Sequence, residues 1–395
     1  MRLIALGLGA LILNSCATTP TSRGDLHASL LTLDTHLDTP VHFARAGWSF
    51  GDRHDYANDL AQLDLPRMAD HGNLDGGFFV IFTDQGPLTL EGYAAARDFA
   101  LKRSDEIDAA VTGFANRIGP ARTAADARHL DAAGKLIAFK SIENSYPLGE
   151  NLSLLGEFYR RGVRLAGPVH SSNNQFADSA TDKPRWNGLS PLGVRWVAEM
   201  NRLGMVIDAS HASDAAFDQM LALSKAPLLL SHSGSRTVFD HPRNLDDARI
   251  RNLAAAGGAI CFTTIYLSDL NMTPERAEVF GKHDQIGQMS PSEQADLIAR
   301  TRALDAKQAM WPVDFETYMA GLLHVIDVAG VDHVCLGADW DGGGGIAGLE
   351  DITAHPKITA RLKAAGHSDA DLAKLWSGNV LRILRAAEIH ASPTR

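Results

Sequence analysis

Short runs of apolar and β-branched residues recur along the chain and predict eight strands. Between most of these runs lie segments rich in Ala, Leu and Arg, in which apolar positions repeat with a helical spacing. Continuous apolar strands that alternate with helices are typical of a parallel sheet covered on both faces. The predicted strands are Leu30–Asp34, Gly77–Phe82, Leu136–Ile142, Val163–Pro168, Met205–Ser210, Pro227–Ser231, Gly258–Thr263 and His333–Ala338. The helical segments include Gly92–Val111, Leu192–Leu203, Ala212–Leu223 and Asp246–Ala256.

Eight such units favour an α/β fold of the (β/α)8, TIM-like barrel type. The alternative is an open, doubly wound sheet, but no glycine-rich phosphate loop follows the first strand. The longest gap, between the seventh and eighth strands, contains polar helical stretches and predicts a helical insertion. These stretches are Pro274–Phe280, Pro291–Leu304 and Asp314–Ala329, and a helical tail is predicted at Ile358–Ala365 and Asp369–Ala387.

The first sixteen residues have the pattern of an export signal. Arg2 is followed by the apolar stretch Leu3–Leu13, which is too short to span a bilayer. The segment Leu13-Asn14-Ser15-Cys16 is similar to a bacterial lipoprotein box, and residues 17–27 suit a flexible tether. We therefore expect residues 28–390 to form one exported barrel domain on the periplasmic or cell-surface face of a bacterial envelope. Cys16 would carry the lipid anchor, and plain secretion is the alternative.

Composition narrows the choice of partner. The 395 residues carry a formal net charge of −10, and no basic patch offsets it. Because a net negative protein repels a polyanion, we do not expect a nucleic-acid partner. Three cysteines are too few for a disulfide framework. Cys261 and Cys335 lie in apolar runs, and we expect them to be buried structural thiols.

Ligand-type polar residues stand where six of the predicted strands stop. Because the carboxyl ends of the strands in a parallel barrel share one mouth, these side chains are expected to meet there. Imidazoles and carboxylates together suit Zn²⁺ or a similar divalent ion, and there are too many of them for one tetrahedral zinc. The residues concerned lie in Asp34-Thr-His36-Leu-Asp38, Ile142-Glu143, Pro168-Val-His170, Asp208-Ala-Ser-His211, Ser231-His232 and Gly337-Ala-Asp339-Trp-Asp341.

The spacing of these residues favours a site for two metal ions. His36 and Asp38 are two residues apart, so both can face the mouth. A carboxylate has two oxygens, which makes Glu143 a natural bridge between two cations, and His211 with His232 would complete the second ion. Two ions about 3.5–4 Å apart can hold a bridging hydroxide at neutral pH.

Ten segments, in order along nearly the whole chain, resemble the membrane dipeptidase (renal dipeptidase) family of zinc peptidases. They are Asp34-Thr-His36-Leu-Asp38, Gln62-Leu-Asp64-Leu-Pro66-Arg67, Phe78-Phe-Val-Ile, Ile142-Glu143, His170-Ser-Ser-Asn173-Asn174, Asp208-Ala-Ser-His211, Ser231-His232-Ser233, Arg243-Asn244-Leu-Asp246-Asp247, Gly337-Ala-Asp339-Trp-Asp341-Gly342 and Gly378-Asn379.

This resemblance implies a distorted (β/α)8 barrel with two Zn²⁺ per chain. It implies that His36 and Asp38 bind one zinc, that His211 and His232 bind the other, and that Glu143 bridges them. The remaining roles that it implies belong to His170 beside the scissile carbonyl, Asp339 near the bridging water, and Arg243 as the clamp on the substrate's terminal carboxylate.

The function expected from these roles is hydrolysis of dipeptides, including ones with a D-residue at the C-terminal position, by attack of the metal-bridging hydroxide. In this scheme His170 donates to the oxyanion and Asp339 moves the proton. A homodimer is compatible with this resemblance.

The nearest alternative is another metal-dependent amidohydrolase that acts on a small amide or ester. Such enzymes bridge their metals with a modified lysine, but strand alternation turns Lys140 to the face opposite Glu143. A non-catalytic metal-binding surface protein is a further alternative, which could dispense with His170 or Asp339.

Overall fold

Nine parallel strands form in residues 26–391, the part of the chain that the computed structural model describes. Eight of them overlap the predicted runs, so the prediction of a parallel α/β fold is confirmed. The first strand is shifted, because β1 covers Leu33–Leu37 where Leu30–Asp34 was predicted. The strands are β1 (Leu33–Leu37), β2 (Gly76–Ile81), β3 (Ile118–Pro120), β4 (Leu136–Ile142), β5 (Val163–Ala166), β6 (Val206–Ile207), β7 (Leu229–Ser233), β8 (Ala259–Phe262) and β9 (Val334–Leu336).

The strands are arranged in a ring. One sheet has the order β1-β2-β4-β5-β6 and a second has the order β7-β8-β9. Isolated parallel bridges join the two sheets at both ends, between Asp208 and Leu229 and between Leu37 and Trp340. The amide of Asp38 donates to the Trp340 carbonyl over 2.8 Å at one of these junctions. This is the arrangement of a TIM-like barrel rather than of an open sheet.

The strand β3 was missed by the sequence prediction. It pairs with Leu136–Ala138 at the start of β4, while β5 pairs with residues near the end of β4. β3 has only three residues, and two of them are Gly and Pro, which are depleted in strands. The pairing of β3 therefore depends on the neighbouring strand β4. Its sequence contains no hydrophobic run from which a strand could be predicted.

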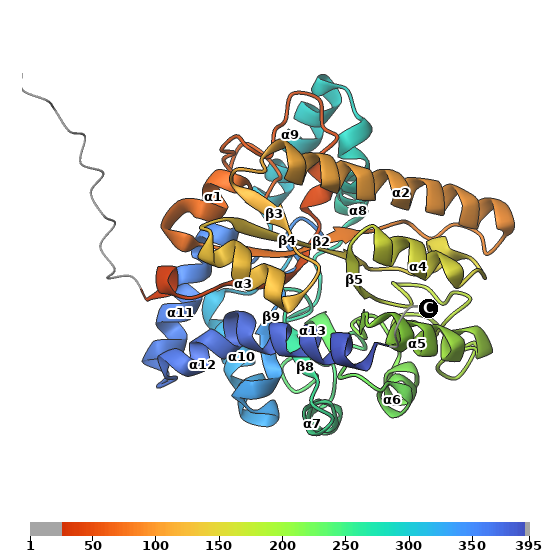
Figure 1. The fold of residues 1–395 in the computed structure, drawn as a ribbon. Coiled ribbons are helices and arrows are strands. Elements are labelled where there is room, and N and C mark those ends of the chain that lie inside the picture. Colours follow the sequence, from red (N-terminus) through yellow and green to blue (C-terminus); the bar gives the residue numbers. More distant parts are fainter. Residues whose placement is uncertain (1–25, 392–395) are drawn as a thin grey trace, which may run out of the picture.

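Helices surround the strands, as Figure 1 shows. Their bounds are α1 (Leu65–Ala69), α2 (Leu90–Gly113), α3 (Ala124–Ala132), α4 (Ser153–Arg160), α5 (Pro191–Leu203), α6 (Asp214–Leu223), α7 (Asp247–Ala255), α8 (Pro274–Phe280), α9 (Pro291–Lys307), α10 (Phe315–Ala329), α11 (His355–Ala364), α12 (Asp369–Ala373) and α13 (Asn379–His390).

Local sequence explains where the helices between β8 and β9 begin. The Ser290 hydroxyl accepts from the Glu293 amide, and the Glu293 carboxylate accepts from the Ser290 amide, which is a capping box at the start of α9. Pro291 occupies the first turn, where its missing N–H costs nothing. Asp314 caps α10 in the same way by accepting from the Thr317 amide.

The helix α13 covers the amino-terminal end of the barrel. Its apolar residues share a buried cluster with Leu33, Leu229 and Ala259, the first residues of β1, β7 and β8. The polar site residues lie at the opposite end of the barrel, where the strands have their carboxyl ends. Gly337 follows β9 there, and a Cβ at this position would lie 1.8 Å from the Ser231 carbonyl. Glycine thus allows the close approach that brings the polar residues after β9 next to those of β7.

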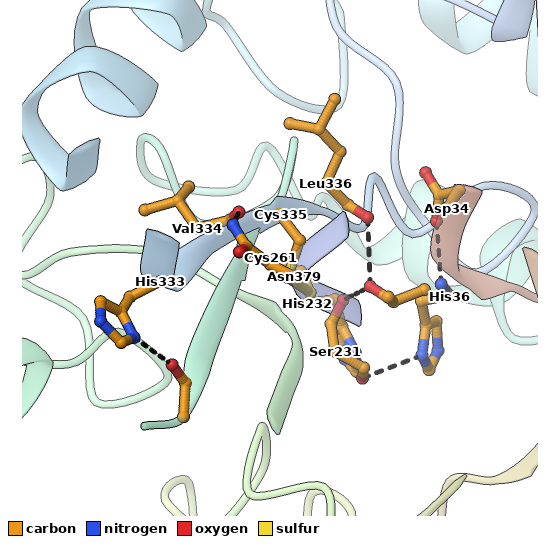
Figure 2. Close-up of a disulfide and its surroundings, with 12 residues drawn as sticks. Asp34, His36, Ser231, His232, Cys261, His333, Val334, Cys335, Leu336 and Asn379 are labelled. Carbon is orange, nitrogen blue, oxygen red and sulfur yellow. Dashed lines mark hydrogen bonds between the residues drawn. A yellow bond between two sulfur atoms is a disulfide. The ribbon is translucent and has the colours of Figure 1, made fainter. Parts of the chain in front are cut away.

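The expectation that Cys261 and Cys335 are free thiols was wrong. Both are buried, but they form a disulfide between β8 and β9 (Figure 2). The parallel register places Cys261 directly opposite Cys335, although 74 residues separate them in sequence. Spacing along the chain gave no sign of this pairing, because only the strand register brings the two residues together.

Removing the disulfide should destabilise the barrel. The double variant Cys261→Ala/Cys335→Ala loses a cross-link over a long loop, which is worth about 4 kcal/mol in the chain-entropy model. We expect chemical denaturation to show a loss of about 2–4 kcal/mol, and reductant should destabilise the wild type but leave the variant unchanged. A variant that unfolds at the wild-type denaturant concentration would show that the bridge does not form.

The export segment Met1–Cys16 and most of the tether lie outside the described residues. Among residues 26–391, no helix is both long enough and apolar enough to cross a membrane.

Candidate metal centre

The predicted site residues converge at the carboxyl ends of the barrel strands. His36 and His232 lie within β1 and β7, and the others follow strands in loops. The carboxylate of Glu143 is central, because its Oε1 atom lies near the Nε2 atoms of four imidazoles. These distances are 2.9 Å to His211, 3.5 Å to His232, 3.6 Å to His36 and 3.7 Å to His170.

Three carboxylates surround the Nε2 atom of His36. Besides Glu143, Asp38 Oδ2 lies at 3.2 Å and Asp339 Oδ1 at 3.7 Å. This nitrogen is buried and makes no hydrogen bond within residues 26–391. Burial opposes protonation, but the charges of Asp38 and Glu143 raise the pKa of His36 well above its usual value. The environment is therefore one that a cation would neutralise.

His211 and His232 form a second group of ligand atoms beside Glu143. Their Nε2 atoms are 2.9 Å apart. Burial and the positive charge of Arg243 lower the pKa of both imidazoles well below the usual value, which favours the neutral form. Neutral imidazole nitrogens and a carboxylate oxygen are ligands that zinc accepts.

Three sets of residues could each hold a metal ion, and Glu143 belongs to two of them. The ligand atoms within each set lie within 4.8 Å of one another. The sets are His36, Asp38 and Glu143; Glu143, His211 and His232; and His36, His232 and Asp339. The donors present therefore fit a divalent metal such as zinc.

A single buried hydroxyl lies behind both groups of ligands. Ser231 Oγ donates to Asp208 Oδ2 over 2.5 Å. It lies 2.8 Å from His232 Nδ1 and 3.3 Å from His36 Nδ1, and Figure 2 shows Ser231 beside these two imidazoles. Because its one proton is given to Asp208, Ser231 can only accept from the imidazoles. This requires Nδ1 of each ring to carry a proton, so that in the neutral imidazoles the Nε2 lone pairs are free for a metal.

Replacing Ser231 by alanine should weaken metal binding. Loss of such a hydrogen bond behind a metal ligand typically costs roughly 10–100-fold in affinity. Zinc affinity measured by chelator competition checks this, and Ser233→Ala is the matched control. Ser233 is also buried in β7, but its hydroxyl bonds a backbone carbonyl and not an imidazole. Equal zinc affinity in Ser231→Ala and Ser233→Ala would show that the Ser231 hydroxyl does not support metal binding.

The carboxylates of Asp34, within β1, and Asp341, after β9, accept hydrogen bonds from backbone amides. Asp34 accepts from the amides of His36 and Ala338 over 2.8 and 3.0 Å, and burial raises its pKa to about 7. Asp341 accepts from the Gln62 amide over 2.7 Å. These carboxylates fix the loops that carry the ligands.

The loop after β9 adopts a strained conformation. Asp339 and Asp341 both have φ of 66°, in the left-handed region that residues with a side chain rarely adopt. Burial and the nearby Asp38 carboxylate raise the pKa of Asp339 to about 8, against the opposing charge of His36. At Gly342, a Cβ would lie 2.2 Å from Asp38 Oδ2 and 2.6 Å from Asp339 Oδ1. Glycine is therefore needed for these two carboxylates to approach each other.

Arg243 lies in the loop after β7 and is 2% exposed. Its Nη2 atom donates to the His232 carbonyl over 3.3 Å, and its guanidinium lies 5.7 Å from the Tyr266 ring centre. Within the described part of the chain, its Nε and Nη1 atoms have no hydrogen-bond partner. A buried guanidinium with unused donors is costly, so it is suited to an anionic ligand.

A cavity of about 200 Å³, here named the active-site cavity, opens over Glu143. His170 lies on its wall, and its side chain is 31% exposed. The wall also contains Met310 and Trp311, which the sequence prediction did not identify as site residues. They stand in loops outside any periodic pattern, so only the fold places them at the site.

Lys140 faces away from the centre, as alternation along β4 predicts. Its Nζ atom lies 2.7 Å from Asp108 Oδ1 and donates to Ser104, both on α2. It is therefore not placed to bridge metals.

Comparisons with known proteins all find similarity to dipeptidases. A model of the membrane dipeptidase family (peptidase family M19) matches residues 22–395. Dipeptidase tcpJ of Claviceps purpurea is 30% identical over 366 residues, which cover 90% of this chain and 76% of that protein. The crystal structure of the probable dipeptidase PvdM from Pseudomonas aeruginosa is 30% identical with a TM-score of 0.78, covering 93% of this chain and 97% of that one. A metallo peptidase from Rhodobacter sphaeroides, liganded with a phosphinate mimic of the dipeptide L-Ala-D-Ala, is 25% identical with a TM-score of 0.71, covering 91% and 99%.

Proposed function

Because the chain belongs to the membrane dipeptidase family, we propose that it is a zinc-dependent dipeptidase with two Zn²⁺ ions per chain. One observation carries this proposal: a cluster of imidazoles and carboxylates lies next to a buried guanidinium that has unused donors. The cluster suits a hydrolytic metal centre, and the guanidinium suits a free carboxylate. A dipeptide has that carboxylate within one residue of its only peptide bond.

The proposed ligands divide between the two ions. His36 and Asp38 would hold one, His211 and His232 the other, and Glu143 would be shared. Two ions bound there would supply Lewis-acid polarisation of the scissile carbonyl and a water activated at neutral pH.

His170 and Asp339 are the proposed proton donor and proton carrier. Both line the active-site cavity beside Glu143. His170 would donate from its imidazole to the oxyanion that develops on the substrate carbonyl. Two cations bound next to Asp339 would favour its ionised form. A carboxylate oxygen of Asp339 would then take the proton of the attacking water and pass it to the leaving amine.

Arg243 would bind the C-terminal carboxylate of the substrate. Its planar fork of N–H donors matches a carboxylate in a bidentate manner. This pairing limits the substrate to very short peptides. We also propose that the site accepts a D-residue at the C-terminal position, because the similar Rhodobacter sphaeroides enzyme binds a mimic of L-Ala-D-Ala.

Hydrolysis of a dipeptide panel by the zinc-loaded protein tests this function. We expect turnover of free dipeptides that is lost on chelation and restored by zinc. Small amides and esters without a free carboxylate form the comparison set. If only these are hydrolysed, the enzyme is an amidohydrolase of another kind, and if nothing is hydrolysed, the chain is a binding protein.

We further propose that residues 28–390 form one exported domain, anchored by lipid on Cys16. The disulfide between Cys261 and Cys335 supports export, since buried disulfides form mainly in oxidising compartments.

The anchor makes a separate prediction. Cys16→Ser should release the protein from membranes and abolish incorporation of labelled fatty acid, with hydrolytic activity unchanged. Membrane fractionation of the wild type and the variant, expressed in a host that processes lipoproteins, checks both effects. If the wild-type protein carries no lipid in that host, the lipid anchor is contradicted and plain secretion is the remaining explanation.

A further inference from the structure

A second cavity lies beside the active-site cavity and is the larger of the two. Its volume is about 300 Å³, against about 200 Å³ for the active-site cavity. Residues of α8 and α9 form one side of this side cavity, and the loop after β9 forms another. Nothing in the proposed mechanism uses this space.

The two cavities share a wall. Phe280, His283, Met310 and Trp311 line both of them, and so does Asp341. The side cavity is therefore the space directly next to the active-site cavity on this side. Met310 and Trp311 belong to the loop between α9 and α10, so the wall is built by the segment between β8 and β9.

The side cavity is suited to an apolar group. Its lining includes the buried aliphatic side chains of Val41, Leu60, Val279 and Ile346. Most of the charge that borders it is already paired. Asp305 lies 2.7 Å from Arg276 and 3.1 Å from Arg302.

The imidazole of His283 adds no charge to this lining. Burial lowers its pKa to about 4, so the ring is neutral at physiological pH. Of the other charged groups in the lining, Asp341 accepts from the Gln62 amide and Glu350 accepts from the Gly348 amide. The space therefore offers little unpaired charge to an ionic side chain.

The position of the side cavity relative to Arg243 decides which part of a dipeptide reaches it. Arg243 contacts the carbonyl of His232, at the end of the site that carries His211 and His232. Val41 and His42, which line the side cavity, follow Asp38, which belongs to the other group of candidate ligands. With the C-terminal carboxylate held at Arg243, the N-terminal residue of the substrate lies on the side of Asp38.

We propose that the side cavity binds the side chain of the substrate's N-terminal residue, and that dipeptides with a large apolar residue in that position are the preferred substrates. This inference rests on the proposed dipeptidase function. Burial of a large apolar side chain in a preformed apolar cavity is favourable in the bound state, and it aids catalysis where it is retained in the transition state.

Two matched series of dipeptides test the preference. In the series Xaa-Gly, kcat/KM should rise by roughly 10-fold or more from Ala-Gly to Leu-Gly and Phe-Gly. In the series Gly-Xaa, the same side chains should make a much smaller difference. Lys-Gly and Asp-Gly should be poorer substrates than Leu-Gly, because their charges would lose water in an apolar space.

Filling the cavity from its rim tests the location. Ala309 and Ala347 line the side cavity but not the active-site cavity, and both are exposed, so a larger residue can be tolerated without disturbing the core. Ala309→Phe and Ala347→Phe should each lower kcat/KM for Phe-Gly by roughly 10-fold and leave Ala-Gly nearly unchanged. Ala109→Phe, at an exposed position on α2, is the matched control.

The outcomes separate this inference from the proposed function. Hydrolysis of Ala-Gly with no gain for Phe-Gly overturns the side-cavity proposal and retains the dipeptidase. A preference in the Gly-Xaa series that the rim variants abolish also overturns it, because the cavity would then bind the C-terminal residue. Absence of hydrolysis in every series contradicts the dipeptidase function itself.

Discussion

Replacing Glu143 by glutamine should abolish nearly all dipeptide hydrolysis and lower the metal content, while the barrel stays folded. One oxygen of Glu143 lies within 3.6 Å of imidazole nitrogens from both groups of candidate ligands. Glutamine keeps the shape of the side chain but removes the negative charge that the two ions would share. Loss of metal activation is worth several kcal/mol, so kcat/KM should fall by at least roughly 1000-fold.

Elemental analysis and circular dichroism of purified protein check the metal content and the fold. Glu150→Gln is the matched control, because Glu150 follows η4 (Tyr146–Leu148) after the same strand but is exposed and has no metal-ligand neighbours among the described sets. A Glu143→Gln protein with two bound ions and wild-type turnover would show that this carboxylate is not shared between ions.

Replacing Arg243 by lysine should have the second largest effect, and the effect should depend on the C-terminus of the substrate. Arg243 is buried and two of its nitrogen atoms are unpaired within residues 26–391, so a substrate carboxylate would satisfy them. Breaking a buried charge pair costs about 2–5 kcal/mol, which corresponds to a loss of roughly 30-fold or more in kcat/KM. Lysine keeps the charge but lacks the planar fork.

The comparison uses a free-acid dipeptide and its C-terminal amide in both proteins. We expect the wild type to prefer the free acid strongly. Arg243→Lys should reduce hydrolysis of the free acid and hardly change the residual hydrolysis of the amide. Arg385→Lys, at an exposed position on α13, controls for the substitution itself. Equal rates on both substrates in the wild type would remove the carboxylate clamp.

Hydrophobic runs were sufficient to predict the strands of the ring, because each strand buried on both faces needs a continuous apolar segment. The same logic placed polar residues such as His36 and Glu143 at one mouth, where the structure brings them within 3.6 Å. Arg243 had no such signature and was identified only through the family resemblance. Its loop lies outside any periodic pattern.

Other features depend on contacts between residues far apart in sequence. The disulfide requires the register of β8 with β9, and the bond from Ser231 to His36 crosses the barrel from β7 to β1. The side cavity depends on how α8 and α9 pack beside the loop after β9. None of these can be read from local spacing, because each arises only when the barrel closes.

Stepwise addition of zinc to the metal-depleted protein, with hydrolysis of one free dipeptide as the readout, tests the two-ion dipeptidase most directly. We expect no turnover without metal and a rise in activity that reaches its maximum at two equivalents of zinc per chain. Full activity at one equivalent, or dipeptide hydrolysis that is indifferent to zinc, would contradict the account.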